Sequence, residues 1–174
     1  MVPLAEYATV FEDATLGDAM DALEAAQAQF DQSKYRHRAV LVCDRKTNKV
    51  LGKISQMDVI RSLEPQYDLM GEKESMSRFG FSPHFMKSIL DQYELWHEPL
   101  KNICQRAERQ KAIDVMYKLT PGEYVKDDAR LSEAIHQLIM GHHQSLLVSR
   151  GTEIVGVLRL TDVFAEICKT RKEK

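Results

Sequence analysis

The segment VLGKISQMDV, residues 50–59, has a counterpart 104 residues further along the chain, IVGVLRLTDV at residues 154–163. The two segments share a glycine, an aspartate and a closing valine at matching positions. In each segment an apolar run typical of a strand passes into the start of a helical pattern. A pattern that recurs at this distance indicates one structural unit that is present twice.

A second pair of matching segments precedes the first pair in the same order. DATLGDAM at residues 13–20 and DARLSEAI at residues 128–135 share Asp, Ala, Leu and Ala at an offset of 115 residues. Apolar residues at helical spacing follow in both copies, which predicts an amphipathic helix in each. The apolar stripe comprises Leu16, Ala19, Met20, Leu23, Ala26 and Phe30 in the first copy, and Leu131, Ala134, Ile135, Leu138 and Ile139 in the second.

Each copy predicts the element order strand–helix–strand–strand–helix. The expected strands are residues 8–10, 40–43 and 50–54 in the first copy, and residues 123–125, 146–148 and 154–158 in the second. Polar turns separate the last two strands of each copy, as a hairpin requires. Neither copy is large enough to bury its sheet face alone. We therefore expect an α+β (mixed α/β) fold in which two βαββα repeats pack pseudo-symmetrically.

Between the copies lies a connector, residues 64–115, which is too long to lack secondary structure in a compact domain. Ser82 and Pro83 predict a helix start that is followed by an apolar face, and Pro99 is expected to end this helix. A second, more charged helix is expected from about residue 100 to residue 116. We divide the chain into a first repeat at 1–63, the helical connector, and a second repeat at 116–174.

The two repeats resemble the cystathionine-β-synthase (CBS) domain, whose pairs form the Bateman module. The resemblance is carried by Asp-Ala-x-Leu-x-(Asp/Glu)-Ala at the first helix and by Gly-hydrophobe-hydrophobe-(Ser/Thr)-x-x-Asp at the last. It covers residues 8–63 and 116–168 and leaves the connector unexplained. It implies a non-enzymatic regulatory module that commonly forms a homodimer. It also implies clefts between the repeats, which in many relatives bind AMP, ADP, ATP or S-adenosylmethionine.

The closing motif of the first repeat also has a chemistry that stands apart from the resemblance. Asp58 follows the point where a strand turns into a helix, and a carboxylate there can accept the hydrogens of a ribose diol. The Ser55 hydroxyl and the first N–H groups of the helix would then face a phosphate. Lys53, His37 and Arg38 could neutralise phosphate charge. The remaining residues predicted to bind the nucleotide are Val10, Ile54, His143, Arg159, Thr161 and Asp162.

The same motif has a purely structural interpretation, because Ser-x-x-Asp before an apolar run is also a capping box that starts a helix. The second repeat departs from the motif by placing Arg159 where the first has Ser55. Arg159 could bind a phosphate, or it could pair with Asp162 and close the site, while Thr161 could serve as an ordinary helix cap. We expect the better ligand site to be the one that carries Ser55 and Asp58.

Composition excludes several classes of protein. A formal net charge of -2 argues against a nucleic-acid binder held by bulk charge. The longest apolar run, residues 39–43, is far shorter than the roughly 18 residues of a membrane span. Three scattered cysteines indicate a reducing, cytoplasmic location and no zinc site. No nucleophile motif or glycine-rich phosphate loop is recognisable, so we expect neither an enzyme nor a required cofactor.

Two further interpretations remain open at this stage. In the first, the repeats form an assembly module without a ligand, and the aromatic connector docks a regulated partner protein. In the second, Glu and His at spacing i, i+3 ligate a metal in an enzyme, a pattern typical of di-metal carboxylate bundles. The pairs with that spacing are Glu94 with His97 and Glu133 with His136. The strands expected around them argue against a four-helix bundle.

Overall fold

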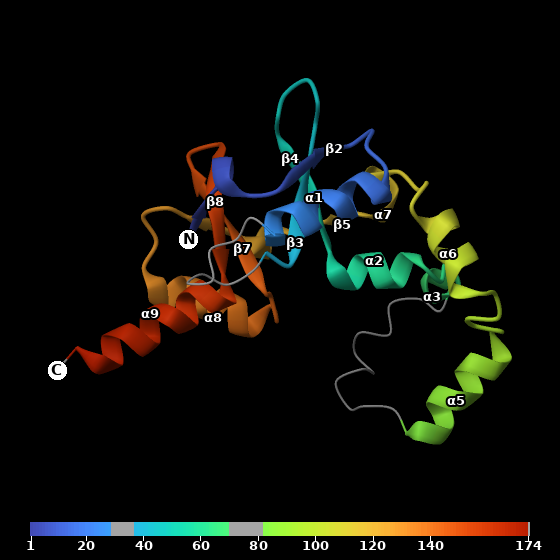
Figure 1. The fold of residues 1–174 in the computed structure, drawn as a ribbon. Coiled ribbons are helices and arrows are strands. Elements are labelled where there is room, and N and C mark those ends of the chain that lie inside the picture. Colours follow the sequence, from blue (N-terminus) through green and yellow to red (C-terminus); the bar gives the residue numbers. More distant parts are fainter. Residues whose placement is uncertain (29–36, 70–81, 174) are drawn as a thin grey trace.

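The computed structural model describes residues 1–28, 37–69 and 82–173, and it shows two four-stranded sheets with helices packed on them (Figure 1). The first sheet has the order β2–β3–β4–β5. Its strands are β2 Thr9–Phe11, β3 Ala39–Cys43, β4 Val50–Ser55 and β5 Tyr117–Lys118. β2 is parallel to β3, and the other two pairings are antiparallel.

The second sheet repeats this arrangement with the order β6–β7–β8–β1. Its strands are β6 Tyr124–Lys126, β7 Ser145–Arg150, β8 Glu153–Arg159 and β1 Val2–Pro3. β6 is parallel to β7, and the other pairings are again antiparallel. The helices of the repeats are α1 Leu16–Ala28 and α2 Gln56–Ser62, matched by α8 Leu131–Met140 and α9 Leu160–Lys172. The predicted α+β fold of two βαββα units is thus confirmed; Phe30 of the first predicted stripe lies outside the described residues.

The edge strands of the two sheets are exchanged between the halves of the chain, a pairing that the repeat pattern in the sequence does not predict. β1, at the N-terminus, pairs with β8, and β5, from the second half, pairs with β4. The register is equivalent in both places, with Val2 opposite Val157 and Tyr117 opposite Lys53. The exchange ties the halves together, so the sheets do not follow the division into residues 1–63, 64–115 and 116–174, which stays a proposal about the sequence repeats.

The exchange explains the glycine that the two closing motifs share. A Cβ atom added at Gly52 would lie 2.6 Å from the carbonyl oxygen of Tyr117, and one added at Gly156 would lie 2.6 Å from that of Val2. Both positions require glycine because the backbone of the exchanged edge strand passes directly over them. The repeated glycine therefore maintains the fold.

The described residues form three core clusters, and strand alternation determines which side chains lie in each. In β3, Val40 and Val42 pack toward the helices of the first repeat, whereas Leu41 and Cys43 join a cluster with β7 and β8 between the two sheets. Residues opposite each other in an antiparallel pair share a face of the sheet. Lys53 lies opposite Leu41, so its side chain is on the face between the sheets.

The connector differs from the prediction at two points. The helix α5 Pro83–Gln92 begins as expected, because the Ser82 hydroxyl accepts a hydrogen bond from the N–H of Phe85. It ends at Gln92, and Pro99 instead precedes the next helix, so the prediction that Pro99 ends α5 was wrong. Two residues with positive φ, Glu94 and Trp96, form the turn between these helices. The connector also contains the short helix α3 Gln66–Leu69.

The prediction of a single helix from residue 100 to residue 116 is also wrong, because the chain forms two helices, α6 Leu100–Ala107 and α7 Ala112–Val115, with a break between them. In the break, the carbonyl groups of Glu108 and Gln110 accept hydrogen bonds from the first N–H groups of α1, at 3.0 and 2.7 Å. These bonds satisfy the free donors at the start of α1. Pairing with a distant helix thus outweighs the helical preference of the segment.

Candidate functional site

The closing motif of the first repeat forms a capping box at the start of α2. Oδ2 of Asp58 accepts hydrogen bonds from the backbone N–H and the hydroxyl of Ser55, at 2.7 and 2.6 Å. The N–H of Asp58 in turn donates to the Ser55 hydroxyl at 3.3 Å. The structural interpretation of the motif is therefore correct as far as Oδ2 is concerned. No hydrogen bond to Oδ1 is made by any residue that the structure describes.

The closing motif of the second repeat has the same backbone arrangement with a different chemistry. Oδ2 of Asp162 accepts the backbone N–H of Arg159 at 3.1 Å. The Arg159 guanidinium then binds both oxygens, with Nε 3.1 Å from Oδ1 and 3.0 Å from Oδ2. The N-cap of α9 is Arg159, so Thr161 lies within the first turn and the suggestion that Thr161 caps the helix was wrong. Of the two possibilities for Arg159, pairing with Asp162 is the one observed.

The ion pair between Arg159 and Asp162 is buried and lies against side chains from the first half of the chain. The side chains of Arg159 and Asp162 are only 9% and 16% exposed. Burial raises the pKa of Asp162, but the hydrogen bonds and charge of Arg159 outweigh it and hold the pKa below its ordinary value. Burial also raises the pKa of Tyr7 to about 12 and, with the Arg159 charge, lowers that of His37. The Tyr7 and His37 rings meet edge to face at 4.6 Å.

A buried ion pair lies beside the first motif as well. Lys53 donates a hydrogen bond to Oε1 of Glu123, and its ammonium is 5.3 Å from the ring of Tyr117. Glu123 ends the short 3-10 helix η2 Pro121–Glu123 and is 1% exposed. Its Oε2 accepts the N–H of Thr120 at 3.0 Å, and Nδ1 of His143 lies 3.9 Å from Oε1. Lys53 therefore links the first sheet to the second half of the chain.

The ion pair with Lys53 affects the pKa of Glu123. Burial raises the pKa of Glu123, but the hydrogen bonds from Lys53 and Thr120, with the charges of Lys53 and His143, outweigh it and leave the pKa below its ordinary value. Sequence reasoning missed this residue. One available indication was that the dipeptide Glu-Tyr occurs at residues 6–7 and again at residues 123–124. In both places the glutamate is the last residue of a 3-10 helix, η1 Leu4–Glu6 in the first case and η2 in the second.

The other predicted nucleotide-binding residues lie in different environments. Arg38 is exposed, and its carbonyl accepts the N–H of Gln56 at 3.1 Å, which places it next to the start of α2. Ile54 is 1% exposed in the core beneath the helices, and Val10 packs against the same core. The side chains of Ile54 and Ser55 therefore point to opposite faces of β4.

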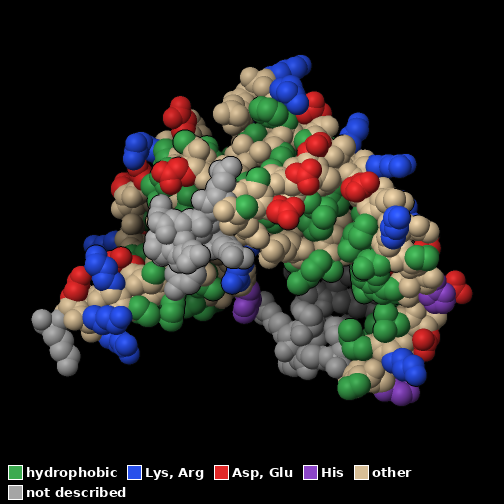
Figure 2. Space-filling view, in the orientation of Figure 1, with side chains coloured by type: hydrophobic (Ala, Val, Ile, Leu, Met, Phe, Trp, Pro, Cys, Tyr) green, Lys and Arg blue, Asp and Glu red, His purple; other side chains and the backbone are tan. Residues whose placement is uncertain are grey.

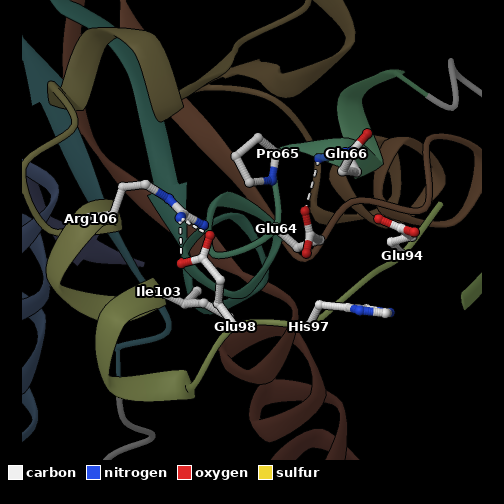
Figure 3. A pocket seen from close by; sticks show the side chains of 8 residues that line it. All are labelled: Glu64, Pro65, Gln66, Glu94, His97, Glu98, Ile103 and Arg106. Carbon is white, nitrogen blue, oxygen red and sulfur yellow. Dashed lines mark hydrogen bonds and ion pairs between the residues drawn. The ribbon is translucent and has the colours of Figure 1, made fainter.

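A separate cavity of about 410 Å³ lies in the connector (Figure 3). The Glu64 carboxylate accepts hydrogen bonds from the backbone N–H groups of Gln66 and Trp96, at 3.2 and 3.0 Å. Both oxygens of Glu98 are 2.8 Å from Arg106. The two bonds to Glu64 hold the turn after α5 against the start of α3. The lining comprises Glu64, Pro65, Gln66, Glu94, His97, Glu98, Ile103 and Arg106.

The metal-enzyme interpretation gains no structural support. Within residues 1–28, 37–69 and 82–173, no group of three or more His, Cys, Asp or Glu side chains is placed to hold a metal ion. Glu94 and His97 both line the connector cavity, where Glu98 is already bound to Arg106. None of the helices in the described part of the chain is long and apolar enough to cross a membrane.

Comparison with known proteins agrees with this architecture. The family model described as CBS domain matches residues 2–65. No curated protein matches the chain. Among solved structures, CBSX2 in complex with AMP is 15% identical, with a TM-score of 0.59 and coverage of 99% of this chain and 95% of that one.

Two other solved structures show the same likeness over nearly the whole chain. The CBS domain of a bacterial CNNM/CorC family Mg²⁺ transporter in complex with ATP is 13% identical, with a TM-score of 0.60 and coverage of 97% and 83%. A CBS domain-containing protein of unknown function from Bacillus anthracis str. Ames Ancestor is 16% identical, with a TM-score of 0.62 and coverage of 97% and 89%. Residues 2–65 are therefore a CBS domain, and the chain as a whole has the fold of a tandem CBS pair.

Proposed function

We propose that the chain is a non-enzymatic regulatory module that binds an adenosine nucleotide at the Ser55–Asp58 motif. The proposal rests on the difference in hydrogen bonding between the two oxygens of the Asp58 carboxylate. Oδ2 caps α2, and Oδ1 is left to accept hydrogen bonds from ribose hydroxyls. The exposed Arg38 beside the same helix start supplies a cation for a phosphate. Complexes of CBSX2 with AMP and of the CNNM/CorC transporter domain with ATP support the ligand class.

The second motif is proposed to bind no nucleotide. Both oxygens of Asp162 are occupied by Arg159, so a ribose would have to displace a buried guanidinium. Displacement would leave a charge in a poorly solvated place, which costs several kcal/mol. We therefore expect one nucleotide for each chain.

Thermal unfolding with separate additions of AMP, ADP, ATP and S-adenosylmethionine tests the proposal. A ligand at 100 times its dissociation constant stabilises the folded state by about 2.7 kcal/mol. Asp58→Asn should abolish the shift, because an amide cannot replace the acceptor pattern of a carboxylate. If no compound raises the unfolding temperature at millimolar concentration, the module does not bind these ligands.

The chain offers a matched control for this variant. Thr15 and Asp18 form a capping box at the start of α1, in which Oδ2 of Asp18 accepts the backbone N–H and the hydroxyl of Thr15, both at 2.8 Å. Asp18→Asn removes the same capping carboxylate from a different helix. It should leave the ligand-induced shift unchanged, so a loss of the shift in both variants would indicate a general effect of destabilisation.

We propose in addition that the module is a homodimer. Large apolar residues are exposed at equivalent positions of the two closing helices, with Ile60 of α2 53% and Phe164 of α9 59% exposed. Ile139 and Met140 of α8 are 64% and 66% exposed, and hydrophobic side chains gather along the edge over α8 and α9 (Figure 2). Exposed apolar patches of this kind mark interaction surfaces. Sedimentation should show a dimer, and Phe164→Glu should give a monomer.

A pure assembly module is the second candidate. It is favoured by α5, whose apolar side includes Met86, 48% exposed, and Leu90, 41% exposed. In this case the connector binds a regulated partner protein and no nucleotide alters the module. The two candidates separate in the ligand screen above, because an assembly module would show no ligand-induced thermal shift with any compound, in the wild type or in Asp58→Asn.

A further inference from the structure

We propose, on the basis of the nucleotide site proposed above, that Glu123 makes this site selective for adenosine ligands with at most one phosphate. Glu123 already neutralises Lys53, the lysine that the sequence would assign to the phosphates. The site would select ligands by their charge, because the Lys53 ammonium near Asp58 is already paired with a carboxylate of the protein.

The positions of Lys53 and Ser55 place this pair beside the site. They are two residues apart on one face of β4, which corresponds to roughly 7 Å along a strand. Ser55 holds Asp58, and Lys53 holds Glu123. A ligand whose ribose is bound by Asp58 and whose phosphates extend along β4 would therefore meet the Glu123 carboxylate in front of the Lys53 ammonium.

A phosphate cannot readily take the place of Glu123. The carboxylate is 1% exposed and also accepts hydrogen bonds from the N–H and the hydroxyl of Thr120, at 3.0 and 3.3 Å. Removing Lys53 from it would leave a buried acid with an incomplete set of partners, which is strongly unfavourable. The pair should therefore stay intact when ligand binds.

The charges then favour a short phosphate chain. Lys53 and Glu123 cancel, and so do Arg159 and Asp162. Arg38 is exposed beside the start of α2 and can hold one phosphate. Among the residues that the structure describes, no further cation is assigned to an additional phosphate, so each one adds negative charge near the carboxylates of Asp58 and Glu123. Like charges at close range weaken binding.

Calorimetric titration of the wild type with adenosine, AMP and ATP tests the proposal. We expect AMP to bind at least about tenfold more tightly than ATP, a factor that one uncompensated charge contact can produce. Glu123→Gln keeps the shape of the side chain and frees the charge of Lys53, and it should bring the AMP and ATP affinities within about threefold of each other. ATP binding as tight as AMP binding in the wild type would overturn the proposal.

Asp127→Asn is the matched control, because it changes the net charge equally and removes a carboxylate from an arginine, Arg150, near the end of β6. It should leave the ratio of AMP to ATP affinity as in the wild type, and an equal change in both variants would overturn the proposal.

If Glu123→Gln does not fold, the salt dependence of ATP binding to the wild type tests the proposal instead. Weakening of more than about tenfold between 50 and 300 mM salt would show that several cations bind the phosphates and would overturn the selection. If neither adenosine, AMP nor ATP binds, the proposed nucleotide site itself fails.

Discussion

The closing motifs of the two repeats have the same backbone position and differ in the residue that starts the helix. In the first, Ser55 is short and leaves one oxygen of Asp58 without a hydrogen bond from the described residues. In the second, Arg159 reaches both oxygens of Asp162 and buries them. The geometry that the two motifs share therefore serves to start a helix. Its use as a binding site depends on the side chain at the cap.

The largest expected effect is on stability and separates the two motifs. Asp162→Ala removes the carboxylate from a buried arginine, whereas Asp58→Ala removes a partly buried capping acid. Breaking a buried pair costs about 3 kcal/mol, and losing a capping hydrogen bond costs about 1 kcal/mol. Urea denaturation of the two variants should show this difference in the free energy of unfolding. Equal losses would mean that Arg159 is not held mainly by Asp162.

The second prediction concerns the loss of stability when the glycine that both motifs contain is replaced. Gly52→Ala and Gly156→Ala each place a Cβ atom 2.6 Å from the carbonyl oxygen of the exchanged edge strand. Overpacking of this kind costs about 2 kcal/mol, and the loss should be similar at both positions. Gly122→Ala is the control, because its nearest neighbouring atom would be 3.7 Å away. A large loss at only one of the two glycines would show that the edge strands are not equivalent.

The pH dependence of stability sharpens the contrast further. The pKa of Asp162 is lowered in the folded state, so its contribution is complete above the ordinary value of 3.8 and is lost as the pH falls through the lower folded value. The difference in unfolding free energy between wild type and Asp162→Asn should therefore be constant near neutral pH and shrink below pH 3.8. Urea denaturation at a series of pH values measures it, and a difference that grows on acidification would contradict the ion pair.

The smallest expected effect compares the two capping boxes. Asp18 is exposed and Asp58 is half-buried, so Asp18→Ala should destabilise the fold less than Asp58→Ala. The loss for Asp58→Ala should be only about 1 kcal/mol, because the bonds it breaks are single hydrogen bonds at a helix end. Thermal denaturation without ligand measures both. A much larger loss at Asp58 would assign this residue a structural role beyond the cap.

The sequence predicted the elements whose information is local. The apolar stripes of α1 and α8, the hairpins, and the cap at Ser82 all follow from residues close together in the chain. It could not predict β1 and β5, because a two-residue strand such as Val2–Pro3 carries no periodicity and exists only through its partner. The break between α6 and α7 was missed for the same reason, since its carbonyl groups bond to α1.

The candidate site shows the same limit. The spacing of Ser55 and Asp58 identified a capping box or a ribose acceptor, and the structure contains the capping box. The spacing could not reveal that Lys53 is neutralised, because Glu123 lies 70 residues further along the chain. Pairing of Arg159 with Asp162 was among the predicted alternatives, because the two residues are one helical turn apart.

The number of AMP molecules bound to each chain distinguishes the two closing motifs. Calorimetric titration of the wild type should give one AMP per chain, and Arg159→Ser, which restores the cap of the first motif, should raise the number to two. Asp58→Asn should bind none. Two AMP molecules per wild-type chain, or full binding by Asp58→Asn, would contradict the proposed difference between the two motifs.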